Sequence, residues 1–154
     1  MPTRNFKAIL LIACSAMSLG AMAATTASGI AFESGGASVE EFTDINSRAS
    51  SYSLKLLMTS RGSGAYIADV DVQVRAKPSG PVVLEHRSEG PLLLAALPPG
   101  RYEVTARYAD VRPGAPTQIT RTVTVPRSGR VQALLQFDTD DVVSTDSPAE
   151  YRSR

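Results

Sequence analysis

The chain is poor in the side chains that most enzymes use, because its 154 residues include one cysteine, one histidine and no tryptophan. A protein zinc site needs about three or four nitrogen, sulfur or carboxylate ligands, and a site rich in histidine or cysteine cannot be built from this composition. A catalytic serine or cysteine would depend on His86 alone as its base. His86 stands between Glu85 and Arg87, a context that favours a surface position or a sheet edge. We therefore expect no catalytic residue, no cofactor and no metal.

An excess of charge of one sign is also lacking. The chain has 16 lysines and arginines against 15 acidic residues, a formal net charge of +1. The basic residues are scattered among the acids, whereas proteins that hold nucleic acid or anionic lipid gather theirs on one surface. We expect the partner to be something other than nucleic acid.

Apolar runs long enough to span a membrane are absent as well. The main apolar run of the chain is short and lies near the N-terminus. Arg4 and Lys7 precede apolar residues 8–13, and Ala21-Met22-Ala23 follows as a small-x-small sequence. These features predict a signal peptide over residues 1–23 with cleavage after Ala23. The run is shorter than the about 20 apolar residues of a membrane span, so the mature chain is expected to have no transmembrane segment. The expected location is periplasmic or secreted.

Cys14 leaves a second interpretation open. The sequence Leu11-Ile12-Ala13-Cys14 is similar to a bacterial lipoprotein box, in which the cysteine is acylated and becomes the N-terminus. That interpretation predicts a lipid-anchored envelope protein. If Cys14 is instead removed with the signal peptide, the mature chain has no cysteine and forms no disulfide.

The rest of the chain divides by composition into three parts. Residues 24–30 are small and polar, so residues 24–37 are expected to be a flexible lead-in, and residues 138–154 predict a disordered polar tail. Residues 38–137 are expected to form one domain. Its first element is a helix over about 39–51, because Ser38 and Glu41 have the spacing of a capping box. Apolar residues recur every three or four positions after Ser38, and we expect the Val39, Phe42 and Ile45 stripe to pack on a sheet.

After residue 51 the apolar residues recur at every second position, which is typical of strands with one buried face. Gly, Pro and Ser separate seven candidate strands, over residues 52–59, 68–76, 82–88, 91–97, 101–108, 117–125 and 131–137, of which 91–97 is apolar throughout. Seven short strands of this kind predict an antiparallel β-sandwich. Arg121 falls on the inward side of its strand, and a bulge or an edge position would resolve this conflict.

The stretch from Gly90 to Tyr108 is the most regular part of this series. It consists of an apolar strand, the turn Pro98-Pro99-Gly100, and a strand whose side chains alternate in polarity. This order predicts an antiparallel hairpin. Tyr102 and Tyr108 share the buried phase with Val104, so core packing is favoured over a tyrosine binding platform with Tyr66.

Two segments resemble the carboxypeptidase regulatory-like domains. They are Ala68-Asp-Val-Asp-Val-Gln-Val74 and Leu94-Ala-Ala-Leu-Pro-Pro-Gly-Arg-Tyr-Glu-Val104. The resemblance covers roughly residues 54–137 and implies a seven-stranded sandwich of the transthyretin (prealbumin-like) type. In the enzymes of that family this domain lies beside the catalytic domain and is not itself catalytic. The chain as a whole also looks like small exported proteins of Gram-negative bacteria that carry this one domain.

The expected function is that of a non-catalytic exported module that binds a protein or a cell-envelope component. The loops over residues 61–64, 78–81 and 112–116 are the expected contact surfaces. The arginines expected to contact the partner are Arg61, Arg101, Arg107 and Arg112. The enzyme alternative is a transthyretin-related hydrolase, because the ending Tyr151-Arg-Ser-Arg154 is similar to the Tyr-Arg-Gly-Ser ending of the hydroxyisourate hydrolases. Those enzymes use more than one histidine, and this chain has only His86.

Overall fold

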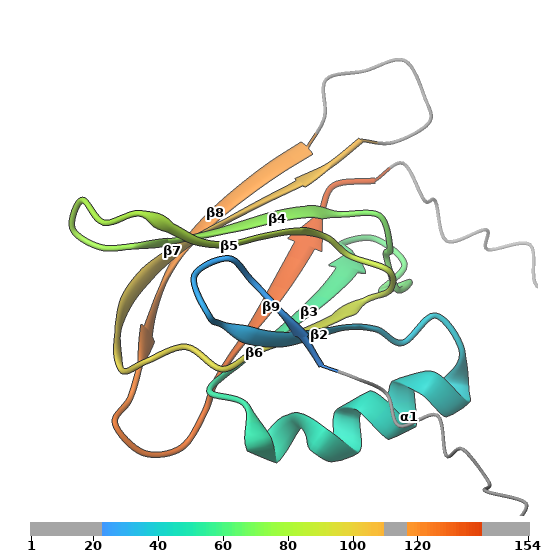
Figure 1. Cartoon of the computed structure of the whole chain (residues 1–154). Helices are drawn as coiled ribbons and strands as arrows, with labels where there is room; N and C mark the ends of the chain where they lie inside the picture. The colour runs from blue at the N-terminus through green and yellow to red at the C-terminus, as the bar shows by residue number, and fades with distance from the viewer. Residues whose placement is uncertain (1–22, 110–116, 140–154) are drawn as a thin grey trace, which may run out of the picture.

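The computed structural model describes residues 23–109 and 117–139, and within these ranges the protein is mainly β (Figure 1). The two helical elements are α1 (Val39–Arg48) and the 3₁₀ turn η1 (Ala49–Ser51). The strands are β1 (Ala24–Thr25), β2 (Ala31–Gly35), β3 (Leu54–Ser60), β4 (Asp71–Ala76), β5 (Val82–Arg87), β6 (Leu92–Ala95), β7 (Gly100–Tyr108), β8 (Thr117–Val125) and β9 (Val131–Phe137).

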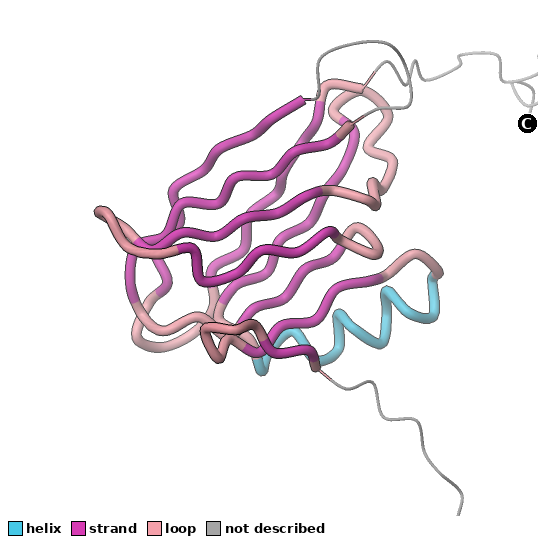
Figure 2. Tube along the Cα trace, turned by 45° about the horizontal axis from the view of Figure 1, so that its top comes forward, coloured by secondary structure: helices cyan, strands magenta, loops and turns pink. Residues whose placement is uncertain are grey.

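The strands form two sheets with a shared apolar core (Figure 2). One sheet has the order β1-β2-β6-β3-β9 and the other the order β5-β4-β7-β8. Alternate residues of each strand point into the core, so that Leu54, Leu56 and Met58 of β3 are fully buried. The same alternation leaves a polar outer face on the four-stranded sheet.

The prediction of seven antiparallel strands was wrong in its count and in one pairing. All seven predicted segments contain a strand, and these strands are β3 to β9. However, β1 and β2 bring the described total to nine, and β9 runs parallel to β3, with Leu54 opposite Val131. The period of two reports which face of a strand is buried and carries no information on strand direction.

Residues 24–37 are also not the lead-in without regular structure that composition predicted. β2 pairs antiparallel with β6, with Glu33 opposite Leu94, and β1 folds back on β2 through a turn in which the Ile30 carbonyl accepts from the Thr26 amide. Ile30 and Phe32 are buried in the core between the sheets. The burial of these two side chains holds the segment against the core, although the many small residues of the segment are typical of unstructured chain.

The helix begins where its sequence predicted. The Ser38 hydroxyl accepts from the Glu41 amide at 3.2 Å, and the Glu41 carboxylate accepts from the Ala37 amide at 3.0 Å, one residue before the position expected for a capping box. Ile45 is buried and Phe42 is half-buried, but Val39 is 78 % exposed. The prediction that Val39 packs on the sheet was therefore wrong. Phe42 packs against the cluster of Ile45 with the β6 leucines, as expected, and it also stacks on Tyr66, with 5.0 Å between ring centroids.

The Gly90–Tyr108 stretch connects the two sheets and is not a hairpin. β6 lies in the five-stranded sheet and β7 in the four-stranded sheet. All four β6 residues are buried because Leu93 faces the core between the sheets, whereas Leu92 and Leu94 face α1 through Ile45. An apolar strand covered on both sides has no alternation, which explains the unbroken apolar run in the sequence.

The conflict at Arg121 is resolved by an edge position, one of the two predicted solutions. β8 is the last strand of its sheet, and Arg121 is exposed there although its neighbours Val123 and Val125 are buried. His86 lies on β5, the opposite edge strand of that sheet, and is half-buried. The predicted signal peptide as far as residue 22, Cys14, Arg112 and the Tyr151 ending lie outside the described residues.

Candidate binding face

The outer face of the four-stranded sheet carries polar side chains from four neighbouring strands. The helix α1 packs on the other sheet and leaves this face uncovered (Figures 1 and 2). Strand pairing sets its rows of side chains. One row runs from Arg87 through Asp71 and Arg107 to Gln118, and the next runs from Glu85 through Gln73 and Thr105 to Thr120. Cross-strand neighbours on one face lie close enough to act together on a ligand.

A cleft of about 550 Å³ opens over these rows. It is lined by Asp71, Val72, Gln73, Glu85, His86, Arg87, Thr105 and Arg107. Its volume falls within the range of about 300 to 1,000 Å³ found for small-ligand sites. Most of its lining side chains are hydrogen-bonding or charged, so a ligand here would be held by polar contacts.

The two arginines of the cleft differ in how their charges are balanced. Arg87 pairs with Asp69 at 3.3 Å and with Asp71 at 3.5 Å. Arg107 donates from Nε to the neutral amide oxygen of Gln118 at 2.7 Å, and no carboxylate within the described residues pairs with it. Among the described residues, no carboxylate forms an ion pair with the Arg107 guanidinium, and its terminal N–H groups make no hydrogen bond.

The four predicted arginines do not come together. Arg107 lies in the cleft, and Arg101 is exposed on the same face of β7, outside the cleft lining. Arg61 follows β3 and pairs with Asp138 at 3.1 Å. Glu85 and Arg87 had no predicted role, although the alternation of polar residues along β4 already predicted a hydrated face.

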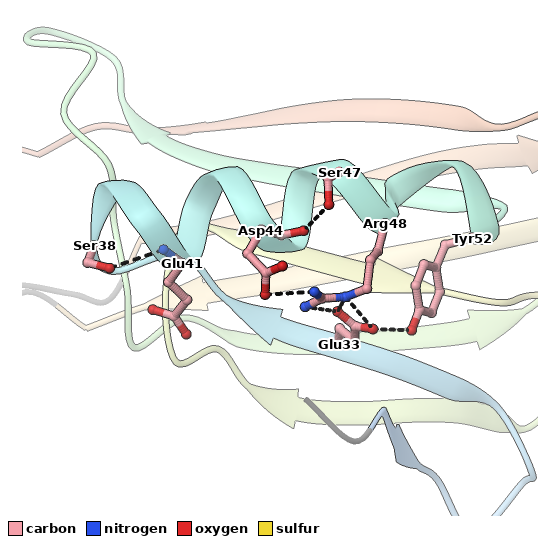
Figure 3. Close-up of polar contacts among 7 residues, drawn as sticks. All are labelled: Glu33, Ser38, Glu41, Asp44, Ser47, Arg48 and Tyr52. Atoms are coloured by element: carbon pink, nitrogen blue, oxygen red, sulfur yellow. Dashed lines mark hydrogen bonds and ion pairs between the residues drawn. The ribbon is translucent and has the colours of Figure 1, made fainter. Parts of the chain in front are cut away.

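A second polar cluster joins α1 to β2 (Figure 3). Glu33, which is 10 % exposed at its side chain, accepts from the Tyr52 hydroxyl at 2.7 Å and pairs with Arg48 at 3.0 Å. Arg48 also pairs with Asp44 at 2.6 Å. The hydrogen bonds that the Arg48 guanidinium donates to Asp44 and Glu33 raise its pKa. Burial, followed by the bond to Glu33, raises the pKa of Tyr52 to about 12.

These groups satisfy one another, so the cluster is better suited to fastening the helix than to binding a ligand. It borders a smaller cleft of about 220 Å³, which Glu33, Asp44 and Arg48 help to line. Glu33 had no predicted role, since its strand was not expected. Its signal in the sequence was a single acid next to the apolar pair Ile30 and Phe32.

His86 borders both clefts without a polar partner. Its ring packs against Phe32 with 4.8 Å between centroids, and its buried Nε2 atom makes no hydrogen bond in the described part of the chain.

In residues 23–109 and 117–139, no three His, Cys, Asp or Glu side chains are grouped as metal ligands would be. Tyr102 is in the core as predicted, whereas Tyr66 is 59 % exposed.

None of the helices in the described ranges has the length and apolar character needed to cross a membrane. A scan against protein-family models gives no match, and no curated protein or solved structure is detectably similar to this chain. Function must therefore be argued from the chain's own residues.

Proposed function

We propose that this protein is a non-catalytic, exported module that binds an extended segment of a protein or another cell-envelope component on its four-stranded sheet. The observation that carries this proposal is the uncovered polar cleft at Arg107. Gln73 and Thr105 form its floor, and both can donate and accept hydrogen bonds. A bound segment that crosses the strands would find a donor or acceptor at each row.

The edge strand β5 adds a second mode of contact. Glu85, His86 and Arg87 of β5 line the cleft, and the outer edge of β5 pairs with no other described strand. Extended peptides bind such edges through their main chain, because the edge presents unpaired N–H and C=O groups. The resemblance to regulatory-like domains agrees with a binding role without catalysis, and we retain that family assignment as part of the proposal.

Capture from envelope extract tests the binding role. The immobilised chain should retain a reproducible component, and Arg107→Ala should lose most of it, because the guanidinium that pairs with no acid among the described residues is removed. Arg127→Ala is the matched control, since Arg127 is exposed on the loop between β8 and β9. Equal capture by both variants, or no reproducible capture by the parent chain, would count against the proposed face.

Export is tested separately by mass spectrometry of the mature N-terminus. We propose cleavage after Ala23 and a periplasmic or secreted location. Ala24 as the first residue supports simple export, and β1 would then begin at the new N-terminus. An acylated Cys14 would instead establish the lipid-anchored form of the same module, and an uncleaved N-terminus would contradict export by either route.

A further inference from the structure

The cleft on the four-stranded sheet has a negatively charged side chain on one side and a positively charged side chain on the other. Two of its four charged residues are already paired, since Arg87 lies against Asp71. The remaining two are Glu85 on β5 and Arg107 on β7. Glu85 is exposed, and its carboxylate forms no hydrogen bond or ion pair with any other residue in the described ranges. The cleft therefore presents one available anion and one available cation.

The spacing of these two charges follows from the sheet. Glu85 and Arg107 are separated by β4 and lie in adjacent side-chain rows. On β4, Gln73 lies opposite Glu85 and Asp71 lies opposite Arg107. With strands about 4.8 Å apart and residues about 3.3 Å apart along each strand, their Cα atoms are roughly 12 Å from one another. Both side chains are long and can lean over the floor, which shortens the span between the charged groups.

We propose that this cleft binds a zwitterionic ligand the size of a short peptide, with its ammonium group at Glu85 and its carboxylate at Arg107. An extended tripeptide spans about 10 Å from end to end, which fits this separation. Its carboxylate would accept from the terminal N–H groups of Arg107. Gln73 and Thr105 would bond to the peptide groups between the ends.

This inference rests on the proposed binding face and adds the chemistry of its ligand. The same pair of charges could come from a free peptide or from lysine and glutamate side chains within a longer chain. We commit to the free peptide, because the Cα separation of the two charged residues matches the length of a tripeptide. The charged residue on the floor between their strands, Asp71, is already paired with Arg87.

Titration of the full chain with trialanine, followed by NMR, tests the proposal. The amide resonances of Gln73 and Thr105 should shift in a saturable way. Trialanine amide and N-acetyl-trialanine should each bind about tenfold more weakly or worse, since each lacks one of the two charges. A blocked peptide carrying lysine and glutamate side chains should bind no better than the capped peptides. Its binding as tightly as trialanine would overturn the choice of a free peptide.

Charge variants test whether the opposite charges at positions 85 and 107 bind the two ends of the peptide. Arg107→Glu should lose detectable trialanine binding, and the double variant Glu85→Arg/Arg107→Glu should regain it, because a zwitterion can bind in the reverse orientation. Arg101→Gln is the matched control on the same strand and should bind as the parent chain does. All three changes replace exposed side chains, and a urea unfolding curve shows whether each variant is folded.

Two negative outcomes have different meanings. Failure of trialanine to bind, or equal binding of the capped peptides, overturns the zwitterion proposal. If capture from envelope extract still depends on Arg107, the binding face survives that result. If capture is also independent of Arg107, both proposals fail together.

Discussion

The Tyr52 hydroxyl donates a 2.7 Å hydrogen bond to Oε1 of Glu33, and this contact joins the end of the helical segment to β2. Glu33 is nearly buried, so its charge depends on Tyr52 and Arg48 for compensation. The contact therefore joins β2, which was not predicted from the sequence, to the helical segment, which was.

Loss of the Tyr52 hydroxyl should weaken the fold. Tyr52→Phe removes a hydrogen bond to a charged acceptor, and we expect the free energy of unfolding to fall by about 1.5 to 3 kcal/mol. Tyr102→Phe is the control, because that hydroxyl donates to the neutral carbonyl of Pro98 at 2.8 Å. It should cost about 0.5 to 1.5 kcal/mol in urea unfolding. A smaller cost at Tyr52 than at Tyr102 would refute the role given to Glu33.

The same contact predicts a dependence of stability on alkaline pH. An unfolded tyrosine has a pKa of about 10, and the folded pKa of Tyr52 is raised to about 12. The native state thus holds this proton more tightly, so its contribution to stability is complete below about pH 10 and is lost as pH rises toward 12. Unfolding curves across this interval should show a steeper decline for the parent chain than for Tyr52→Phe. If the free energy of unfolding declined equally with pH in the parent chain and in Tyr52→Phe, the raised pKa of Tyr52 would be contradicted.

The N-cap should account for part of the helix stability. Ser38→Ala removes the acceptor of the Glu41 amide and should cost about 1 kcal/mol. Ser47→Ala makes the same chemical change on the exposed side of α1, where the hydroxyl donates to the Asp44 carbonyl within the helix. Because alanine is the better helix former, this variant should change stability by less than about 0.5 kcal/mol. Thermal unfolding compares the two variants directly, and equal effects would argue against the cap.

Gly90 is required by the close approach of two backbones. A Cβ atom at this position would collide with the backbone of Gly35 at the end of β2. Gly90→Ala should therefore displace β2 and cost about 1 to 3 kcal/mol. At Gly100 a Cβ would make only ordinary contact with the Tyr102 ring at 3.6 Å. A chemical denaturation series in which Gly100→Ala is the more damaging variant would show that this packing is wrongly assigned.

The sequence predicted local structure better than pairing. The capped helix and the seven strand segments were all found, because capping, alternation and the turn residues between strands depend on near neighbours. The partner of a strand depends on distant residues, so β6 and β7 were predicted as one hairpin although they belong to different sheets. β2 was missed because only Ile30 and Phe32 reveal its buried face within a run of small residues.

The candidate site was predicted only in part for the same reason. Arg107 was singled out as an exposed arginine, and the structure places it in the cleft. Glu85 and Arg87 were passed over because their importance comes from neighbours on β4 and β7, which no local pattern identifies. Arg61 was favoured for its loop, yet it pairs with Asp138 away from the cleft.

Site-specific photo-crosslinking in the exporting cell tests the central claim most directly. A photoreactive residue replaces Gln73 on the cleft floor in one variant and Gln132 on the opposite sheet in the other. If the four-stranded sheet is the binding face, position 73 should yield a discrete covalent adduct that position 132 does not. No adduct at position 73, or the same adduct from both positions, would contradict the account.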